Sequence, residues 1–127
     1  MSRMSIGPSK VLHRIKEGYA FAWSGSQALT ASGTYLLDFN TPAEPYLFRI
    51  TLQFDWSSMA VNDVFSYAIY LDDQAMLTYK TVLTAEILGN NPNQFEIIVP
   101  ANTTFQIRCT NDNDRGYGGA SLSGYKV

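Results

Sequence analysis

The amino-acid sequence predicts an all-β protein, a single eight-stranded antiparallel sandwich of the jelly-roll type that follows an N-terminal arm. Apolar and polar residues alternate over two long stretches, which is typical of strands with one buried and one solvated face. Clusters of Gly, Pro, Asn and Asp separate the extended stretches, and no stretch with a helical period reaches three turns. A length of 127 residues suits one domain. We assign the arm to residues 1–18 and the sandwich to residues 19–127.

The first part of the chain has the weakest strand signals. Within the arm, SKVLHRIKEG at residues 9–18 is expected to form at most a short helical turn. Two short strands are predicted next, from Tyr19 to Ser24 and from Thr34 to Phe39, and turn-forming residues bound both of them. The second strand ends before NTPAEP, where two prolines prevent its continuation.

The strongest strand signal is YLFRITLQFDW at residues 46–56. Every second residue is apolar, and the residues between them are polar apart from Leu47. This period of two predicts a strand with one face in the core. The predicted inward face consists of Tyr46, Phe48, Ile50, Leu52, Phe54 and Trp56.

The middle of the chain predicts a hairpin. VFSYAIYLDD at residues 64–73 and AMLTYKTVL at residues 75–83 are rich in β-branched and aromatic residues, with Asp72, Asp73 and Gln74 as the turn. Both faces of the hairpin carry apolar groups, so we expect deep burial or coverage by another chain. Glycosidases use paired carboxylates, but neighbouring strand residues point to opposite faces, so Asp72 and Asp73 are interpreted as an acidic turn.

Three strands are predicted in the last third of the chain. They span Phe95 to Val99, TTFQIRCT at residues 103–110, and Ala120 to Val127. In the middle strand Phe105, Ile107 and Cys109 share one face. Cys109 is therefore expected to point inward as a small hydrophobic residue instead of acting as a reactive thiol.

Composition favours a protein that packs against neighbours. Apolar residues make up 46% of the chain and charged residues 16%, against about 25% charged residues in an average globular protein. The arm is mildly basic, but its cations are too sparse to predict binding of nucleic acid. No apolar run is long enough for a membrane span. We expect the arm to pack onto another subunit through its apolar residues, which are Ile6, Val11, Leu12 and Ile15.

The polar stretch TNDNDRGYGG at residues 110–119 is the strongest candidate for a chemical site. Laid on the calcium-binding EF-hand loop, it fails because Arg115 and Leu122 occupy ligand positions. We therefore predict no metal site, and Asp112 and Asp114 are the candidates for a looser calcium site. The sequence contains one Cys and one His, and His13 lies in the arm outside any predicted strand, which removes most nucleophilic and multi-histidine schemes. We predict no cofactor and no enzymatic activity.

Aromatic side chains offer an alternative function. Exposed Trp and Tyr rings on a sandwich can stack on sugars, although aromatic residues in strands usually belong to the core. The alternative hypothesis is a carbohydrate-binding or receptor-binding β-sandwich module. Its candidate ligand-facing residues are Trp23, Trp56, Tyr117 and Tyr125.

The C-terminal residues 95–127, FEIIVPANTTFQIRCTNDNDRGYGGASLSGYKV, resemble the closing strands of small jelly-roll structural proteins of bacteriophage virions. The resemblance lies in an apolar strand ending in VPANT, an alternating strand, a polar loop and the final ASLSGYKV. It implies a non-enzymatic virion protein, a capsid, decoration or spike subunit. The expected partners are further copies of the chain and other virion proteins, with a host surface glycan as a further ligand.

Overall fold

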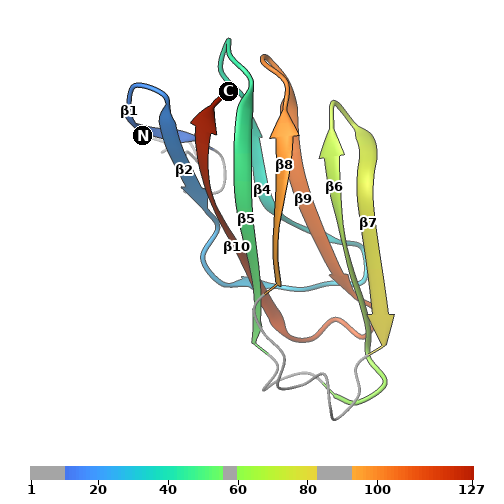
Figure 1. Ribbon diagram of the computed structural model, residues 1–127. Helices are drawn as coiled ribbons and strands as arrows, with labels where there is room; N and C mark the ends of the chain where they lie inside the picture. Colours follow the sequence, from blue (N-terminus) through green and yellow to red (C-terminus); the bar gives the residue numbers. More distant parts are fainter. Residues whose placement is uncertain (1–10, 56–59, 83–92) are drawn as a thin grey trace, which may run out of the picture.

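The computed structural model describes residues 11–55, 60–82 and 93–127, and these ranges contain ten strands and no helix. No part of the described chain is therefore a helix long and apolar enough to span a membrane. Figure 1 shows the strands running along the long axis of the molecule. The strands are β1 (His13–Lys16), β2 (Tyr19–Trp23), β3 (Gln27–Ala28), β4 (Thr34–Asn40), β5 (Tyr46–Asp55), β6 (Val64–Leu71), β7 (Gln74–Val82), β8 (Asn93–Val99), β9 (Thr104–Asn111) and β10 (Tyr117–Lys126).

The strands form two antiparallel sheets packed as a sandwich. Sheet A has the order β1-β2-β10-β5-β8, with β3 also paired to β10, and sheet B has the order β4-β9-β6-β7. The pairs are nested: β6 pairs with β7, β5 with β8, β4 with β9 and β2 with β10. A long hairpin folded over into two sheets produces this order, which is the jelly roll. The predicted antiparallel sandwich is confirmed.

Two short strands were not predicted. β3 is a two-residue segment that pairs with the start of β10. β1 lies where the sequence predicted a short helical turn, and that prediction is wrong. A single helical turn is costly to nucleate, whereas β1 gains backbone hydrogen bonds by pairing with the free edge of β2. His13 consequently lies in a strand, contrary to the prediction.

The inner faces of both sheets form one core. The period of two in β5 is confirmed, because its inward residues are at most 4% exposed. Across the sandwich, the Phe48 ring lies 5.4 Å from that of Phe105 and 5.9 Å from that of Phe39, each edge-on. The inward residues of β5 in the described range are Tyr46, Phe48, Ile50, Leu52 and Phe54.

The predicted hairpin is confirmed as β6 and β7. Asp72 and Asp73 form its turn with positive φ angles of 50° and 67°, as a two-residue turn that matches the twist of the strands requires. The Asp72 carboxylate accepts a hydrogen bond from the Thr104 backbone N–H at 2.9 Å. The acidic turn is thus a structural element that ties the hairpin to β9.

Candidate functional site

The edge of the sandwich formed by β7 and β8 exposes apolar side chains, and we call it the open flank. β7 is the last strand of sheet B and β8 is the last strand of sheet A. Leu77 and Tyr79 pair with the core residues Ile69 and Tyr67, so they lie on the inner face of β7. They are nevertheless 41% and 43% exposed, because no strand in the described ranges covers them.

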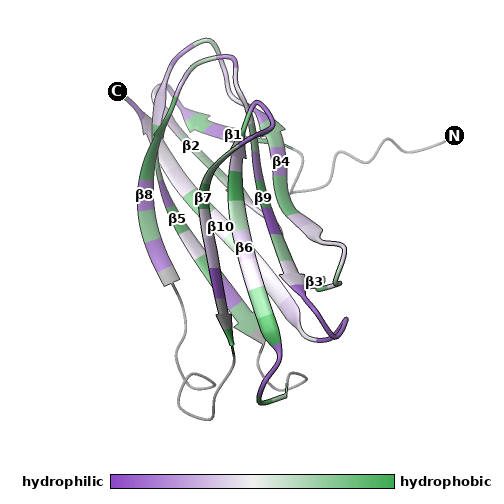
Figure 2. Cartoon of the chain, turned by 90° about the vertical axis from the view of Figure 1, so that its right-hand side faces the viewer, coloured by the Kyte–Doolittle hydropathy of each residue, from purple (hydrophilic) through white to green (hydrophobic). Residues whose placement is uncertain are grey.

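The other face of β7 is also apolar in part. Val82 pairs with Val64 at the end of the strand and is 47% exposed. Met76 lies at a β-bulge near the turn and is 58% exposed. Figure 2 looks onto the side of the molecule where β7 and β8 lie. An edge strand with exposed apolar groups on both faces also leaves backbone groups unpaired, and it is a ready template for another chain.

β8 supplies the second wall of the open flank. Phe95 and Ile97 are half-buried and pack against the core, and the Phe95 ring lies 6.1 Å from the Tyr67 ring. Ile98, on the outer face of β8, is 60% exposed. The apolar strip therefore continues from β7 across the edge of the sandwich to β8. Of the two expectations for the hairpin, deep burial holds for β6 but not for β7.

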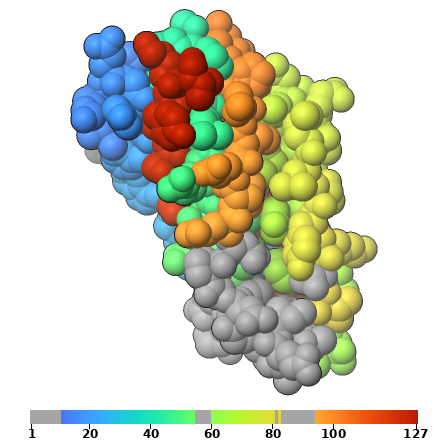
Figure 3. Space-filling model, in the orientation of Figure 1, coloured from blue at the N-terminus to red at the C-terminus, as the bar shows by residue number. Residues whose placement is uncertain are grey.

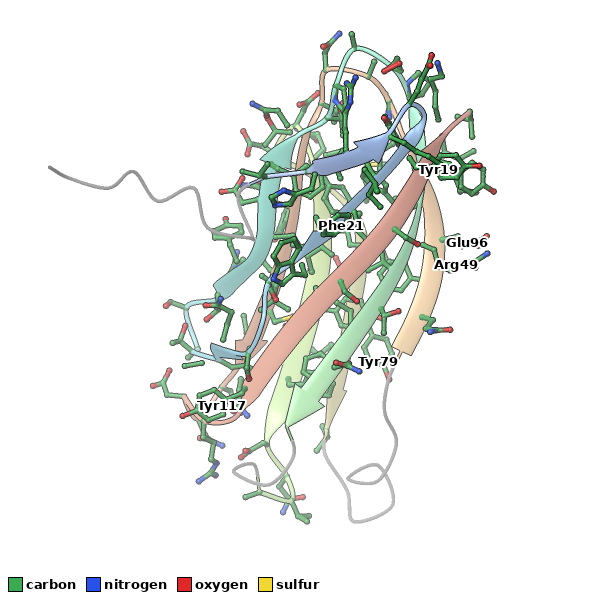
Figure 4. The ribbon with its side chains drawn as sticks, turned by 90° about the vertical axis from the view of Figure 1, so that its left-hand side faces the viewer. Tyr19, Phe21, Arg49, Tyr79, Glu96 and Tyr117 are labelled. Atoms are coloured by element: carbon green, nitrogen blue, oxygen red, sulfur yellow. The ribbon has the colours of Figure 1, made fainter. Side chains whose placement is uncertain are left out.

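The outer face of sheet A carries a second candidate surface, a cluster of stacked rings. Phe21 and Trp23 point outward from β2, with ring centroids 5.2 Å apart. The His13 ring from β1 lies 5.3 Å from Phe21 and 4.8 Å from Trp23, with similar tilt. We call these three residues the ring cluster. Figure 4 shows Phe21 on β2, with Tyr19 toward one end of the face and Tyr117 toward the other.

Two hollows lie beside the ring cluster. The first has a volume of about 500 Å³ and lies between Trp23 and Tyr117, over Gly118 and Gly119. The second has a volume of about 400 Å³ and is bounded by Phe21 and Arg49. Trp23 and Ser121 line both hollows, so they are neighbouring parts of one trough along β10. Figure 3 shows this face of the molecule, with β10 between β2 and β5.

The first hollow exists because the chain leaves the sheet between β2 and β3. Trp23 pairs with Ser121 and Gln27 pairs with Gly118, while the intervening residues loop away. The loop is anchored at Ser24, whose hydroxyl accepts a hydrogen bond from the Ala120 N–H at 2.9 Å. A Cβ on Gly119 would lie 2.8 Å from the Gly25 carbonyl oxygen, so glycine is required on this floor.

The charge at the trough is neutralised by one ion pair. Arg49, at the second hollow, donates to the Glu96 carboxylate from two guanidinium nitrogens, each at 2.9 Å. Figure 4 shows the two side chains together at the edge of sheet A. Both are largely exposed, so the pair contributes little to stability.

The polar loop after β9 is organised by a buried carboxylate that the sequence did not reveal. Asp63 is 1% exposed and accepts two hydrogen bonds from Arg115, both at 2.8 Å. It also accepts hydrogen bonds from Asn113, Asn111 and the Ala60 N–H. The Arg115 guanidinium, opposed in part by burial, holds the pKa of Asp63 well below its usual range. Arg115 of this loop therefore already supplies the positive charge that balances the Asp63 carboxylate.

The two calcium candidates accept hydrogen bonds from backbone N–H groups of adjacent segments. Asp112 accepts a hydrogen bond from the Val64 N–H at 2.9 Å, and Asp114 accepts one from the Ala31 N–H at 2.6 Å. Within the part of the chain that the structure describes, no group of three or more His, Cys, Asp or Glu residues is placed to hold a metal ion. Calcium binding here stays a hypothesis for experiment.

The described residues that were predicted to face ligands lie at two separate places on sheet A. Trp23 and Tyr117, 38% and 44% exposed, face the first hollow from its two ends. Tyr125 is 46% exposed and its ring lies 6.5 Å from that of Tyr19, near the other end of β10. Trp56 lies outside the described residues. Two of the four predicted residues thus share one hollow.

The predicted assembly arm divides between two environments. Leu12 packs against the core of its own sandwich and Val11 is half-buried. Ile15, on β1 at the edge of sheet A, is 65% exposed. Ile6 lies outside the described residues. Among the described arm residues, Ile15 is the apolar group most available to a second chain.

Cys109 is buried in the core with 0% exposure, which confirms its predicted orientation. Burial raises the pKa of its thiol to about 12. Tyr67, beside it on β6, also has a raised pKa, caused first by burial and then by Tyr79 and Cys109. A thiol in this environment is protonated at neutral pH and does not act as a nucleophile.

Comparison with known proteins identifies the fold and no family. No family model matches the sequence, and no curated protein matches it. A structure from a study of Bacillus endospore appendages, described as a novel family of disulfide-linked pili, is similar over 99% of both chains, with 12% identity and a TM-score of 0.55. The VP2 subviral particle of infectious bursal disease virus is similar over 99% of this chain and 37% of that one, with 14% identity and a TM-score of 0.51.

A third similar structure is the dimeric latent PorU from Porphyromonas gingivalis. It shares 7% identity, with a TM-score of 0.50, over 90% of this chain and 13% of that one. At such low identities these similarities demonstrate a shared sandwich architecture alone. The function must be argued from the surfaces of this chain.

Proposed function

We propose that the protein is a non-enzymatic structural subunit that assembles with copies of itself into a larger particle or appendage. The observation that carries the proposal is the open flank, where β7 exposes apolar side chains on both faces at the end of sheet B. Isolated soluble proteins usually blunt such an edge with charges, Pro or a covering loop. In the described part of β7 the charged side chain is Lys80 alone.

The interaction that fits this edge is strand addition by a second copy. β7 has nine residues, so it presents an edge about 30 Å long to a partner strand. Backbone hydrogen bonds would supply affinity, and Leu77 and Tyr79 would be covered on the inner face. Ile15 on β1, together with the preceding arm residue Ile6, would add a second contact between subunits.

Two further facts support assembly. Only 16% of the residues are charged, so much of the surface can be buried against a neighbour without desolvating charges. One similar structure is described as a pilus and another as a viral particle. The finer proposal is that the particle is a bacteriophage virion, in which this chain is a capsid, decoration or spike subunit. The alternative, a carbohydrate-binding or receptor-binding module, concerns the outer face of sheet A, and both functions can coexist in one subunit.

The mass of the purified protein in solution tests the proposal. We expect the wild type to sediment as a closed oligomer or a longer assembly. The double variant Met76→Lys, Val82→Lys should sediment as a monomer with an unchanged circular dichroism spectrum. The matched control is Tyr35→Lys, Val127→Lys, which changes two residues of similar exposure and should assemble normally, because Tyr35 lies on β4 at the opposite end of sheet B and Val127 follows β10 of sheet A. A wild type that stays monomeric at hundreds of micromolar would overturn the proposal.

A further inference from the structure

We propose that the trough along β10 on the outer face of sheet A is a binding site for an uncharged oligosaccharide. The first hollow has the size of a small-ligand site, since such sites range from about 300 to 1,000 Å³, and its volume is about 500 Å³. Trp23 closes one end and Tyr117 the other, with glycines between them. Sugars present an apolar face of C–H groups and a polar rim, and an aromatic ring matches the apolar face.

The two aromatic positions are well separated along β10. Trp23 on β2 pairs with Ser121 on β10. Ser121 lies four residues after Tyr117 on β10, so the positions of Trp23 and Tyr117 are about 13 Å apart along the strand. Gly119 occupies the outward position between them, and its lack of a side chain leaves the space open. A side chain of ordinary size at position 119 would fill the hollow as well as clash with the Gly25 carbonyl.

The chemistry of the lining selects an uncharged, hydroxyl-rich ligand. The described residues that line the first hollow carry no charge, and they include Ser26, Gln53 and Ser121 as hydrogen-bonding groups. In the second hollow the cation Arg49 is already paired with Glu96. An anionic ligand such as a phosphate would therefore find no free cation among these residues, whereas sugar hydroxyls can both donate to and accept from them.

The binding face is preorganised. The Trp23 ring is held on both His13 and Phe21, with centroid distances of 4.8 and 5.2 Å. A ring fixed in this way loses little conformational entropy when a ligand stacks on it. Because Trp23 and Ser121 line both hollows, a chain of two or more sugar units can follow β10 from the first hollow into the second.

An array of neutral and acidic oligosaccharides, probed with the full-length wild-type protein, identifies the ligand, and titration calorimetry with the best neutral glycan gives its affinity. We expect Trp23→Ala to weaken binding at least tenfold. Ser121→Phe should abolish binding, because Ser121 lines both hollows and a large ring there fills them. The matched control is Tyr35→Ala, which removes an exposed ring of similar exposure from β4 in the other sheet and should bind normally.

Three outcomes would overturn the site. They are a wild type that binds no glycan on the array, binding restricted to acidic glycans, and Trp23→Ala and Ser121→Phe variants that bind as the wild type does. If the wild type binds no glycan and Trp23→Ala changes the mass of the assembly in solution, the trough is instead a contact between copies. The open-flank variant Met76→Lys, Val82→Lys should keep its affinity per site, so this proposal and the assembly proposal fail independently.

Discussion

Arg115 donates two hydrogen bonds of 2.8 Å to the buried carboxylate of Asp63, across 52 residues of sequence. The pair joins the loop before β6 to the loop after β9, and Asn111 and Asn113 complete the shell around the carboxylate. This network fixes the long polar connection at one end of the sandwich.

Replacement of Asp63 should destabilise the protein. Asp63→Ala leaves the buried Asn111 amide and the Ala60 N–H without their acceptor, and an unsatisfied buried donor costs about 2 kcal/mol. Urea unfolding followed by tryptophan fluorescence measures the change. Asp114→Ala, which removes a carboxylate from the exposed part of the same loop, is the control and should lose clearly less stability.

The same carboxylate predicts the direction of acid sensitivity. The pKa of Asp63 is lowered by folding, so its contribution to stability is complete above its unfolded pKa of about 4 and is lost as the pH falls below that value. Thermal unfolding between pH 7 and pH 2 should show this loss in the wild type. In Asp63→Asn the decline below pH 4 should be shallower, and an identical decline in both proteins would contradict the assignment.

Cys109 should be inert in the folded protein. Burial raises the pKa of its thiol to about 12, so very little thiolate exists at pH 8. A colorimetric thiol reagent should react with one thiol per chain after denaturation and with none before it. Rapid reaction of the native protein would show that β9 opens readily.

Gly124 is required for packing of β10 on β5. A Cβ at this position would lie 2.5 Å from the Phe48 ring, so Gly124→Ala should cost about 2 kcal/mol through overpacking. Ser123→Ala, at the exposed neighbouring position, is the matched control and should be nearly neutral. Chemical denaturation of both variants gives the comparison. Equal stability of the two would indicate that Phe48 moves aside without cost.

Neither added calcium nor a chelator should change the thermal stability of the protein. Asp112 and Asp114 already accept hydrogen bonds from the Val64 and Ala31 backbone, and Arg115 supplies a positive charge to the same loop. We expect the same melting temperature in excess calcium and in a chelator. A rise of several degrees with calcium would support a site at Asp112 and Asp114 instead.

The two-residue alternation of apolar side chains and the residue types at the turns predicted the strands, because both are local properties of the sequence. The alternation in β5 and β9 follows from which side chains share a face, and the Asp72–Asp73 turn follows from residues that tolerate positive φ. The boundary of β10 was less accurate: it begins at Tyr117 instead of Ala120, because its glycines pair with β3 and β5.

Strand order and long-range contacts could not be predicted in this way. The sequence of β7 resembles that of β6, and only the position of β7 at the end of sheet B leaves its apolar residues exposed. Asp63 carried no signal, since its partners lie about 50 residues away in sequence. The ring cluster also went unpredicted, because nothing local indicates that His13 stacks on Trp23.

β10 comes after all the other strands in the described part of the chain, yet it lies between β2 and β5 inside sheet A. During synthesis sheet A therefore stays split in two until this strand has left the ribosome, and its neighbours must wait with unpaired edges. The outer face of sheet A is therefore incomplete until residues 117–126 have been translated.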